Sequence, residues 1–338
     1  MWTISVLTTS RYTMTVAIGF MVCGANSDLF GRRWFLVGGN VLLFIGFILG
    51  GAANNNSAMI AAFALIGFGA GNAQLAAFAL PELLPNKWRH IAIVIADFWV
   101  IVAAVLGPVA GRFAGASGKA GWQWLFYGPA ICTASSFIGL FLYYFPPKHP
   151  RGLPTKQAIR ELDYGGAFLF IVATTLILTG INYTTVLPSS DPTVIGTLCA
   201  GFGLMVCFAL YERYAPLKQP LTPTHVFTRN KGRALTAPFC AAFVVTMFYY
   251  MVNVVYPTMI NVWYTQPADY KYQAVLTLPG NLGLAFGAAL LSAFGTKVGH
   301  WRWQLVISIT GMVLFGALLG LGNPGNMGYV SDCTMFSI

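Results

Sequence analysis

The chain has 338 residues, of which 57% are hydrophobic and only 8% are charged, and its mean hydropathy is +0.68. Soluble proteins carry about 25% charged residues, so the composition excludes a soluble globular protein and indicates a membrane protein. The formal net charge of +10 would suggest nucleic-acid binding in a soluble chain. Here the basic residues lie in short loops, where they set membrane orientation and attract anionic lipid, so we expect no nucleic-acid partner.

Apolar segments of the length that a transmembrane helix needs, roughly 20 residues, recur along the whole chain. A further apolar segment starts near residue 325 and continues to 338. The sequence therefore predicts an all-α polytopic membrane protein with about ten transmembrane helices. The predicted spans are 4–25, 34–53, 57–80, 91–112, 123–145, 165–183, 193–211, 234–256, 273–295 and 303–321.

The basic residues predict which loops face the cytoplasm. Alternation of the spans places five loops on one side, and these hold 15 of the 19 Lys and Arg residues. Because basic loops stay on the cytoplasmic side, we predict that this side is cytoplasmic. The five loops are 26–33, 84–90, 146–164, 212–233 and 296–302, and the other four bases are Arg11, Arg112, Lys119 and Lys271.

The first of these loops is a charged stretch punctuated by glycine, called here the charged loop (residues 24–33). It reads G-x-x-x-D-x-x-G-R-R, from Gly24 through Asp28 and Gly31 to Arg32 and Arg33. Gly24 would let two helices approach closely, and Gly31 would allow a tight reversal. Asp28 can pair with an arginine or lie at a helix N-terminus, where the dipole favours an anion. A cytoplasmic anchor formed by the two arginines is the simpler alternative.

The charged loop closely resembles the signature loop between the second and third helices of the major facilitator superfamily of transporters. The resemblance implies a cytoplasmic latch that stabilises one state of an alternating-access cycle, with Asp28 and Arg32 in that role. In the second half, the stretch 294–300 occupies the equivalent loop, where Gly299 matches Gly31 and Thr296 replaces the aspartate. Such a weak internal repeat is typical of the two halves of a transporter.

The resemblance also sets the expected domain organisation. One span precedes the charged loop, so we expect the family's first helix, and its last two or three, to be missing from this chain. Two extra spans follow the first five, as in the 14-span drug:H+ antiporter branch of the superfamily. The expected parts are an N-terminal half (1–146), a cytoplasmic loop (147–164), two inserted helices (165–211), a second loop (212–233) and a partial C-terminal half (234–338).

A glycine–proline motif lies in the predicted span 91–112. Gly107, Pro108 and Gly111 match the family's antiporter motif G-x-x-x-G-P-x-x-G, although Ala103 replaces the first glycine. Pro108 removes a backbone hydrogen bond and bends the helix, and the two glycines permit close packing against a neighbour. In the family this motif implies export, and an ordinary kinked helix is the alternative.

Asp97 is the only acidic residue well inside a predicted span, and a charge there is costly if it faces lipid. Pro108 lies eleven residues further on, about 20° away around the helix and therefore on the same face. We predict that Asp97 faces a cavity and carries protons or contacts substrate; a buried, partnered structural aspartate is the alternative. Arg11, in the outer part of the first span, either reaches the membrane surface or pairs with an acid in the cavity.

Polar and aromatic side chains in other spans are candidates for the same cavity. Asn72 and Gln74 belong to the glycine-rich end of span 57–80, where Phe63 stands in place of the arginine that the family links to proton transfer. Aromatic and amide surfaces suit bulky, amphipathic, weakly charged ligands, and helix packing is the alternative explanation for these residues. The candidates in the second half are Tyr249, Tyr250, Asn253, Tyr256, Gln273 and Asn281.

Further stretches resemble the fungal trichothecene efflux pump group, which also holds siderophore transporters. The resemblance implies secondary active efflux of a small amphipathic toxin or drug, driven by proton influx. The alternatives are a siderophore-iron transporter of the same group and a truncated, non-transporting remnant. The stretches that carry the resemblance are PELLPNKWR (81–89), GWQWLFY (121–127), YFPPKHPRG (144–152) and LDYGG (162–166).

The sequence indicates no enzyme. His90, His149, His225 and His300 are scattered over the predicted cytoplasmic loops, and there is no phosphate-binding loop of the type G-x-x-x-x-G-K-[ST]. The six cysteines form no C-x-x-C pair and are interpreted as small buried hydrophobic residues. We therefore expect no cofactor and no metal. The expected partners are the lipid bilayer, a small-molecule substrate and protons. We expect a monomer, located in the plasma membrane in preference to the vacuolar membrane.

Overall fold

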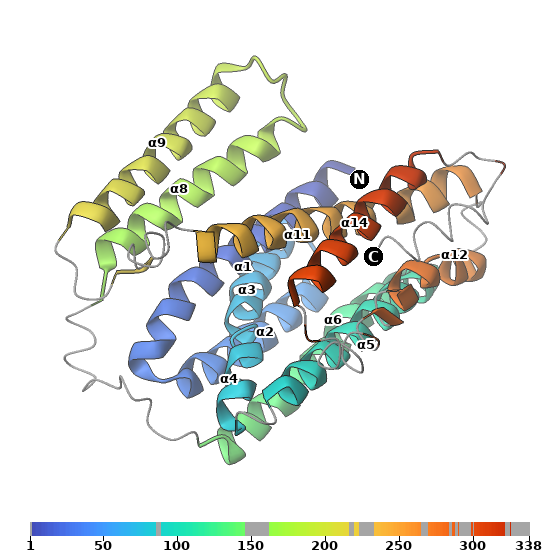
Figure 1. Cartoon of the computed structure of the whole chain (residues 1–338). Helices are drawn as coiled ribbons and strands as arrows, with labels where there is room; N and C mark the ends of the chain where they lie inside the picture. Colours follow the sequence, from blue (N-terminus) through green and yellow to red (C-terminus); the bar gives the residue numbers. More distant parts are fainter. Residues whose placement is uncertain are drawn as a thin grey trace. The chain divides into compact units, whose positions relative to one another are not determined.

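The computed structural model describes residues 2–85, 89–145, 162–215, 220–222, 233–264, 270–283 and 301–321, with isolated positions between 286 and 325. In these ranges the regular elements are all helices (Figure 1), which confirms the predicted all-α fold. In chain order they are α1 (Trp2–Phe30), α2 (Arg32–Ala52), α3 (Asn56–Ala73), α4 (Ala76–Leu83), α5 (Arg89–Ala116), α6 (Gly118–Tyr143), α8 (Tyr164–Tyr183), α9 (Pro192–Tyr214), α11 (Arg233–Met259), the π-helix η2 (Ile260–Tyr264), α12 (Tyr270–Leu276) and α14 (Trp301–Leu319).

Seven helical segments of the described part are long and apolar enough to cross a membrane. Two shorter apolar helices, Tyr12–Gly24 and Trp303–Leu319, fall in the predicted spans 4–25 and 303–321. The predicted span 273–295 is described in its first part, as α12 and a helical stretch at 278–283. The seven long segments are Arg32–Ala52, Asn56–Leu83, Phe98–Ala116, Gly121–Tyr143, Tyr164–Tyr183, Pro192–Tyr214 and Thr236–Trp263.

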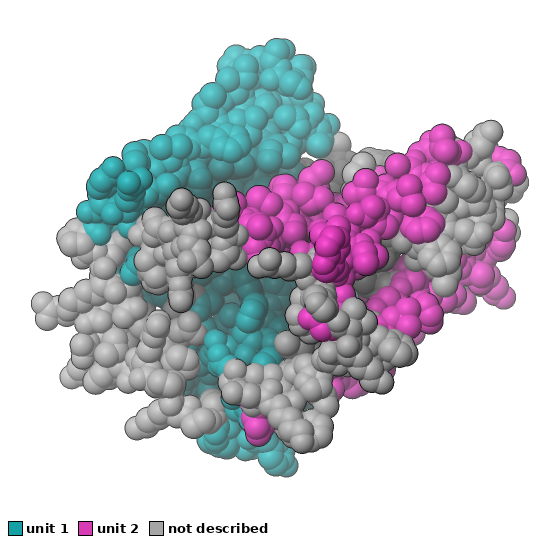
Figure 2. Space-filling view, viewed as in Figure 1, with its two compact units in different colours: residues 1–83, 123–231 teal, residues 84–122, 232–338 magenta. Residues whose placement is uncertain are grey.

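The chain forms two compact units, coloured separately in Figure 2. Unit 1 comprises residues 1–83 and 123–231, and unit 2 comprises residues 84–122 and 232–338. Unit 2 therefore combines α5, which precedes the α8–α9 pair in the sequence, with helices that follow this pair. The division of the sequence into halves with two inserted helices stays a prediction, because compactness groups helices by contact and not by origin.

Glycines let the first three helices of unit 1 pack closely. A Cβ atom added at Gly39 of α2 would lie 2.5 Å from the Cβ of Asn72, and one added at Gly69 of α3 would lie 2.8 Å from the carbonyl oxygen of Gly39. Gly71 of α3 faces α1 in the same way, with a Cβ position 2.6 Å from the Val16 carbonyl oxygen. Small residues at such contacts let helix backbones approach in a membrane, so this sequence packs α3 against both α1 and α2.

The pair α8 and α9 lies side by side in unit 1 (Figure 1), and each helix begins at an aspartate that caps it. The Asp163 carboxylate accepts a hydrogen bond from the Gly166 amide at 2.8 Å, and the Asp191 carboxylate accepts one from the Thr193 amide at 2.8 Å. These bonds satisfy amides that have no partner inside the first helical turn. Asp191 is also followed by Pro192, whose fixed φ suits the first helical position.

In unit 2, a proline near the end of α11 is followed by the π-helix η2, and the end of α11 contacts α12. Pro257 lies in the last turns of α11, and the π-helix η2 follows directly. Proline removes a backbone hydrogen bond, and wide π turns occur mostly as short insertions at such irregularities. The Tyr256 hydroxyl then donates a hydrogen bond of 2.7 Å to the Leu276 carbonyl oxygen, which ties the end of α11 to α12.

The cysteines differ in part from the sequence interpretation. Cys23 is buried, but Cys132, Cys199, Cys207 and Cys240 are exposed on the described helices, and all five are free thiols. The prediction that the cysteines are buried was therefore wrong for these four. An apolar helix in a membrane needs no protein neighbour on every side, because lipid also provides an apolar environment.

Candidate functional site

The charged loop is shorter in the structure than its sequence suggests. Helix α1 continues to Phe30, and α2 begins at Arg32, so Gly31 alone connects them, with φ at +90°. This φ is strained for any residue with a Cβ. Gly299, the matching glycine of the second half, also has a positive φ of +72° and lies two residues before α14 begins. The two matching glycines thus both have a positive φ.

Arg32 forms an ion pair inside unit 1. A terminal guanidinium nitrogen of Arg32 lies 2.8 Å from a carboxylate oxygen of Glu82, near the end of α4. The Arg32 side chain is 14% exposed and that of Glu82 47% exposed, so water reaches this pair from the Glu82 side. Tyr144 lies close by: burial raises the pKa of its hydroxyl, the positive charge of Arg32 lowers it, and the negative charge of Glu82 raises it. The pair holds the start of α2 against the end of α4.

Arg33 points to the end of α6. It donates a hydrogen bond of 2.9 Å from Nη2 to the Phe141 carbonyl oxygen, and its guanidinium carbon lies 3.9 Å from the ring centre of Phe145. It also lies 5.4 Å from the ring centre of Trp34. Both geometries are typical of cation–π contacts. Arg32 and Arg33, neighbours in sequence, therefore join α2 to α4 and to α6, respectively.

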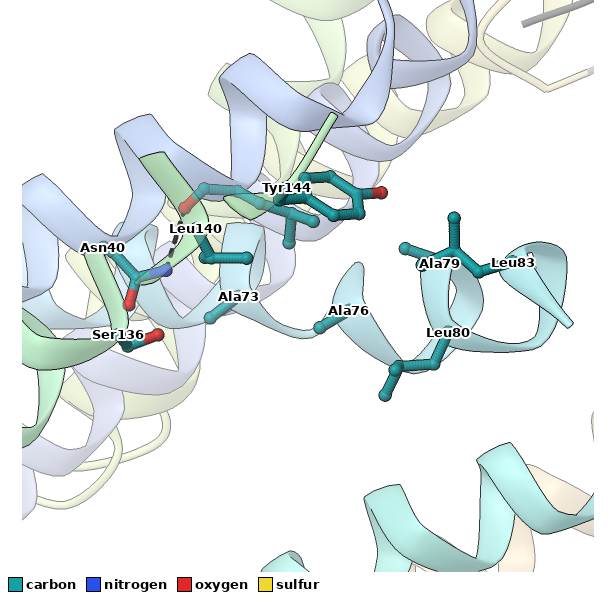
Figure 3. A pocket seen from close by; sticks show the side chains of 10 residues that line it. Asn40, Ala73, Ala76, Ala79, Leu80, Leu83, Ser136, Leu140 and Tyr144 are labelled. Atoms are coloured by element: carbon teal, nitrogen blue, oxygen red, sulfur yellow. Dashed lines mark hydrogen bonds between the residues drawn. The ribbon is translucent and has the colours of Figure 1, made fainter. Parts of the chain in front are cut away.

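A pocket of about 300 Å³ lies in unit 1 (Figure 3). Its walls come from α2, α4, α6 and the end of α3, and most of them are apolar. Figure 3 shows Leu140 and Tyr144 on one side and Ala79, Leu80 and Leu83 of α4 on the other. The lining residues are Leu36, Asn40, Ala73, Ala76, Ala79, Leu80, Leu83, Ser136, Leu140 and Tyr144.

A second polar cluster lies in unit 2 and centres on Arg112 of α5. One nitrogen, Nη1, donates a hydrogen bond of 2.6 Å to the Asn261 side-chain oxygen and one of 2.7 Å to the Gln273 side-chain oxygen. Asn261 belongs to η2 and Gln273 to α12, so Arg112 joins three elements that are distant in the sequence. Gln273 is buried, at 6% exposure. We call Arg112, Asn261 and Gln273 the Arg112 cluster.

Further buried polar groups continue from Gln273 of α12 into the turn at Thr277 and the helical stretch 278–283. The Thr277 hydroxyl donates to the Ala274 carbonyl oxygen at 2.8 Å, and the Asn281 amide donates to the Thr277 carbonyl oxygen at 3.3 Å. Gln273, Thr277 and Asn281 are all buried and recur every four residues, so they share one helix face. This polar face, in an otherwise apolar segment, is the kind of surface that lines a binding or translocation path.

Most of the chain matches the model of a known family. The family model described as "Fungal trichothecene efflux pump (TRI12)" matches residues 3–327. The chain belongs to this trichothecene efflux pump family.

The curated relatives agree with this assignment. The chain is 44% identical to the MFS-type transporter prx5 of Penicillium rubens, over 97% of this chain and 64% of the relative. It is 25% identical to the trichothecene efflux pump TRI12 of Fusarium sporotrichioides, over 95% of this chain and 54% of the relative, and 28% identical to that of Trichoderma arundinaceum, over 97% and 54%. The chain thus spans about half to two thirds of the length of these relatives.

Membership of the trichothecene efflux pump family makes the chain part of a multi-pass membrane transporter and not an enzyme. The fold agrees, since seven described segments can span a membrane. In the described part no group of three or more His, Cys, Asp or Glu side chains is placed to hold a metal ion.

The structure places several other predicted residues of this transporter. Asn72 is buried and donates to the Phe68 carbonyl oxygen of its own helix at 3.0 Å, whereas Gln74 is exposed at the end of α3. Tyr250 is exposed and its ring packs edge-on against that of Tyr249, with centres 5.4 Å apart. Asn72 therefore contributes to the packing of α3 against α2, and whether it also contacts substrate stays a prediction.

The glycine–proline motif lies within α5. Pro108 is inside this helix, between Gly107 and Gly111. Among the described residues nothing lies within 4 Å of a Cβ atom added at either glycine, so their close packing stays a prediction. At Gly24 an added Cβ would make an ordinary contact of 3.8 Å with Leu75.

Four predicted side chains lie outside what the structure describes, although their backbones are helical: Arg11, Asp28, Asp97 and Asn253. Their roles remain predictions. Two residues that the sequence did not single out, Glu82 and Asn261, complete the two polar clusters. Arg112 carried a signal, because it follows Gly111 directly and is one of the few bases away from the predicted cytoplasmic loops.

Proposed function

We propose that this protein is a proton-coupled efflux transporter for a small amphipathic compound, working by alternating access. Its trichothecene-exporting relatives support export of a compound of this chemical class. The aromatic and amide surface of α11 and α12 supports an uncharged or weakly charged substrate. Secondary transporters bind substrate between their two halves and alternate access by rocking these halves.

The Arg112 cluster is the observation that carries the proposal. Alternating access requires contacts between the halves that form in one state and break in the other. Arg112 belongs to the predicted first half, whereas Asn261 and Gln273 belong to the predicted second half, and three amide and guanidinium groups hold them together. The predicted topology puts all three near the outer ends of their helices. We infer that the cluster closes the transporter on the outer side.

The proposed proton carrier is Asp97. A carboxylate in the membrane segment of α5, on the helix face that also carries Pro108, would be exposed to a central cavity and could alternate between protonated and charged forms. Arg112 lies on the same helix, fifteen residues further along, so protonation at Asp97 and opening of the Arg112 cluster would act on one rigid element. This would couple proton entry to substrate release.

Transport by the purified protein in proteoliposomes tests the proposal. With an imposed pH gradient we expect accumulation of a fluorescent or radiolabelled sesquiterpenoid, and its abolition by a protonophore. Asp97→Asn should remove the dependence on the gradient but retain substrate binding. Gradient-independent transport by wild type, or unchanged coupling in Asp97→Asn, would refute the proton role. Uptake of an iron chelate without sesquiterpenoid movement would refute the proposed substrate class.

A further inference from the structure

The pocket beside Arg33 carries an inference that the transport cycle does not require. It has the volume of a small ligand site, its walls are mostly leucine and alanine, and it lies inside unit 1 and shares no residue with the Arg112 cluster. Asn40, the most deeply buried polar side chain in the wall, already donates its amide hydrogen to the Leu36 carbonyl oxygen at 2.9 Å. The pocket therefore favours an apolar occupant over a strongly polar one.

Arg33 places a positive charge at the rim of this pocket. It precedes Leu36 by three residues and so lies on the same face of α2. Its hydrogen-bond acceptor, the Phe141 carbonyl oxygen, lies between the lining residues Leu140 and Tyr144 in the sequence. The charged end of Arg33 and the apolar pocket are thus adjacent.

The two neighbouring arginines differ in how their charges are balanced. Arg32 is paired with Glu82 at 2.8 Å, whereas in the described part of the chain no carboxylate lies within 4 Å of Arg33. The Arg33 Nε atom is buried and has no hydrogen-bond acceptor there. Aromatic rings supply its surroundings instead, at Phe145 and Trp34. Arg33 therefore keeps a positive charge that no described carboxylate neutralises.

The surface around Arg33 has the composition of a membrane interface. Trp34, Tyr143 and Phe145 are 62%, 84% and 67% exposed, and exposed tryptophan and tyrosine next to a basic residue are characteristic of the level of the lipid headgroups. The predicted topology puts this end on the cytoplasmic side, where the lipids are partly anionic. The apolar wall matches an acyl chain, the positive rim matches a phosphate, and the interfacial aromatic rings match a glycerol region. These are three parts of one lipid molecule.

We propose that this pocket binds an acyl chain of an anionic phospholipid from the cytoplasmic leaflet, whose phosphate contacts Arg33. A transported amphipathic compound is a weaker match, because it would leave the charge of Arg33 unused. Occupation by another segment of the protein itself would likewise leave Arg33 without an anion. The lipid would connect α2, α4 and α6 on the side where Arg32 and Glu82 already join two of them.

Photo-crosslinking tests this assignment in the purified protein, held in nanodiscs of phosphatidylcholine with a minor fraction of diazirine-labelled phosphatidylserine. Peptide mapping should find the label on pocket residues of α2, α4 and α6. Labelling should exceed that by diazirine-labelled phosphatidylcholine about fivefold, the factor that corresponds to about 1 kcal/mol for one basic residue near a membrane surface.

Three variants test the charge and two test the cavity. Arg33→Gln should abolish the preference for phosphatidylserine, and Arg33→Lys should retain it. Arg213→Gln is the matched control and should not affect the preference, because Arg213 also lies near an aromatic ring at a helix end, with its guanidinium carbon 5.6 Å from the ring centre of Tyr214. Ala76→Phe should fill the pocket and abolish labelling, whereas Ala209→Phe, on the exposed side of α9, should not.

Four results would overturn the proposal. They are equal labelling by the two lipids in wild type, labelling that persists in Ala76→Phe, absence of label from the pocket walls, and displacement of the lipid by a transported sesquiterpenoid. Absence of label would mean that the protein itself covers the pocket, and displacement would mean that the pocket is a substrate path. Size-exclusion profiles of all variants identify any that fail to fold, and the Arg33→Lys and Arg213→Gln comparisons remain decisive without Ala76→Phe.

Discussion

Replacing Arg112 by leucine should open the contact between α5 and the two elements η2 and α12. The change removes two hydrogen bonds of 2.6 and 2.7 Å donated by a charged group, each of which contributes about 1.5–3 kcal/mol when its partners are shielded from water. Because Arg112 is partly exposed, we take about 2–4 kcal/mol for both together. This corresponds to a shift of at least about 30-fold in the equilibrium between closed and open forms.

Spin labels at Ser117→Cys, at the end of α5, and Tyr272→Cys, in α12, report on this contact in a background without other cysteines. Pulsed electron–electron double resonance should give one narrow distribution of distances between the two spin labels in the parent protein. After Arg112→Leu this distribution should be broader and its mean distance longer. Lys271→Leu is the matched control, since it removes a charge predicted to lie on the same side from an exposed position of α12. An unchanged distribution in Arg112→Leu, or the same change in Lys271→Leu, would refute the reasoning.

Three further predictions concern stability and pH. Gly39→Ala should lower the free energy of unfolding by about 1–3 kcal/mol through overpacking. Gly38→Ala should not lower it, because no described atom lies within 4 Å of its Cβ position. Thermal unfolding of the two variants tests this difference. Glu82→Gln should lower it by up to about 1 kcal/mol, the range for partly exposed ion pairs, and adding Arg32→Gln should cost little more in a double-mutant cycle. The hydrogen bond from the Thr193 amide lowers the pKa of the Asp191 carboxyl, so protonation of this carboxyl in acid should loosen the start of α9. Hydrogen exchange of the first amides of α9 measures this loosening, and an exchange rate unchanged in acid would contradict the prediction.

The membrane spans could be predicted from the sequence because their signal is local. A run of about 20 apolar residues must form a helix in lipid, where every backbone polar group has to be satisfied inside the segment. For the same reason the described helices fall within the predicted spans or extend them by a few residues, as α5 does beyond residue 112 to Ala116. That extension matters, because it places Arg112, the last residue of the predicted span, about one turn before the end of the helix.

Gly31 was also predictable, because its requirement is local: only glycine adopts a φ of +90° without strain, and the reversal from α1 to α2 takes a single residue. By contrast, Asn261 and Gln273 lie 149 and 161 residues from Arg112, and an amide side chain has no periodicity or spacing that marks it as a partner. Gln273 was a candidate from the sequence because of its residue type. Only the structure shows that its side-chain oxygen accepts a hydrogen bond from Arg112.

Glu82 changes the interpretation of the charged loop. The family resemblance gave the latch role to Asp28 and Arg32 together, but the Arg32 guanidinium already has a carboxylate partner 2.8 Å away within unit 1. A guanidinium carries five N–H donors, and the pair with Glu82 uses one terminal nitrogen of Arg32, so Arg32 can contact a second acceptor without breaking this pair. Arg33, in turn, is held by the Phe141 carbonyl oxygen and the Phe145 ring. The latch role of Asp28 and Arg32 therefore stays a prediction, and the structure adds that Arg32 also holds the start of α2 against the end of α4.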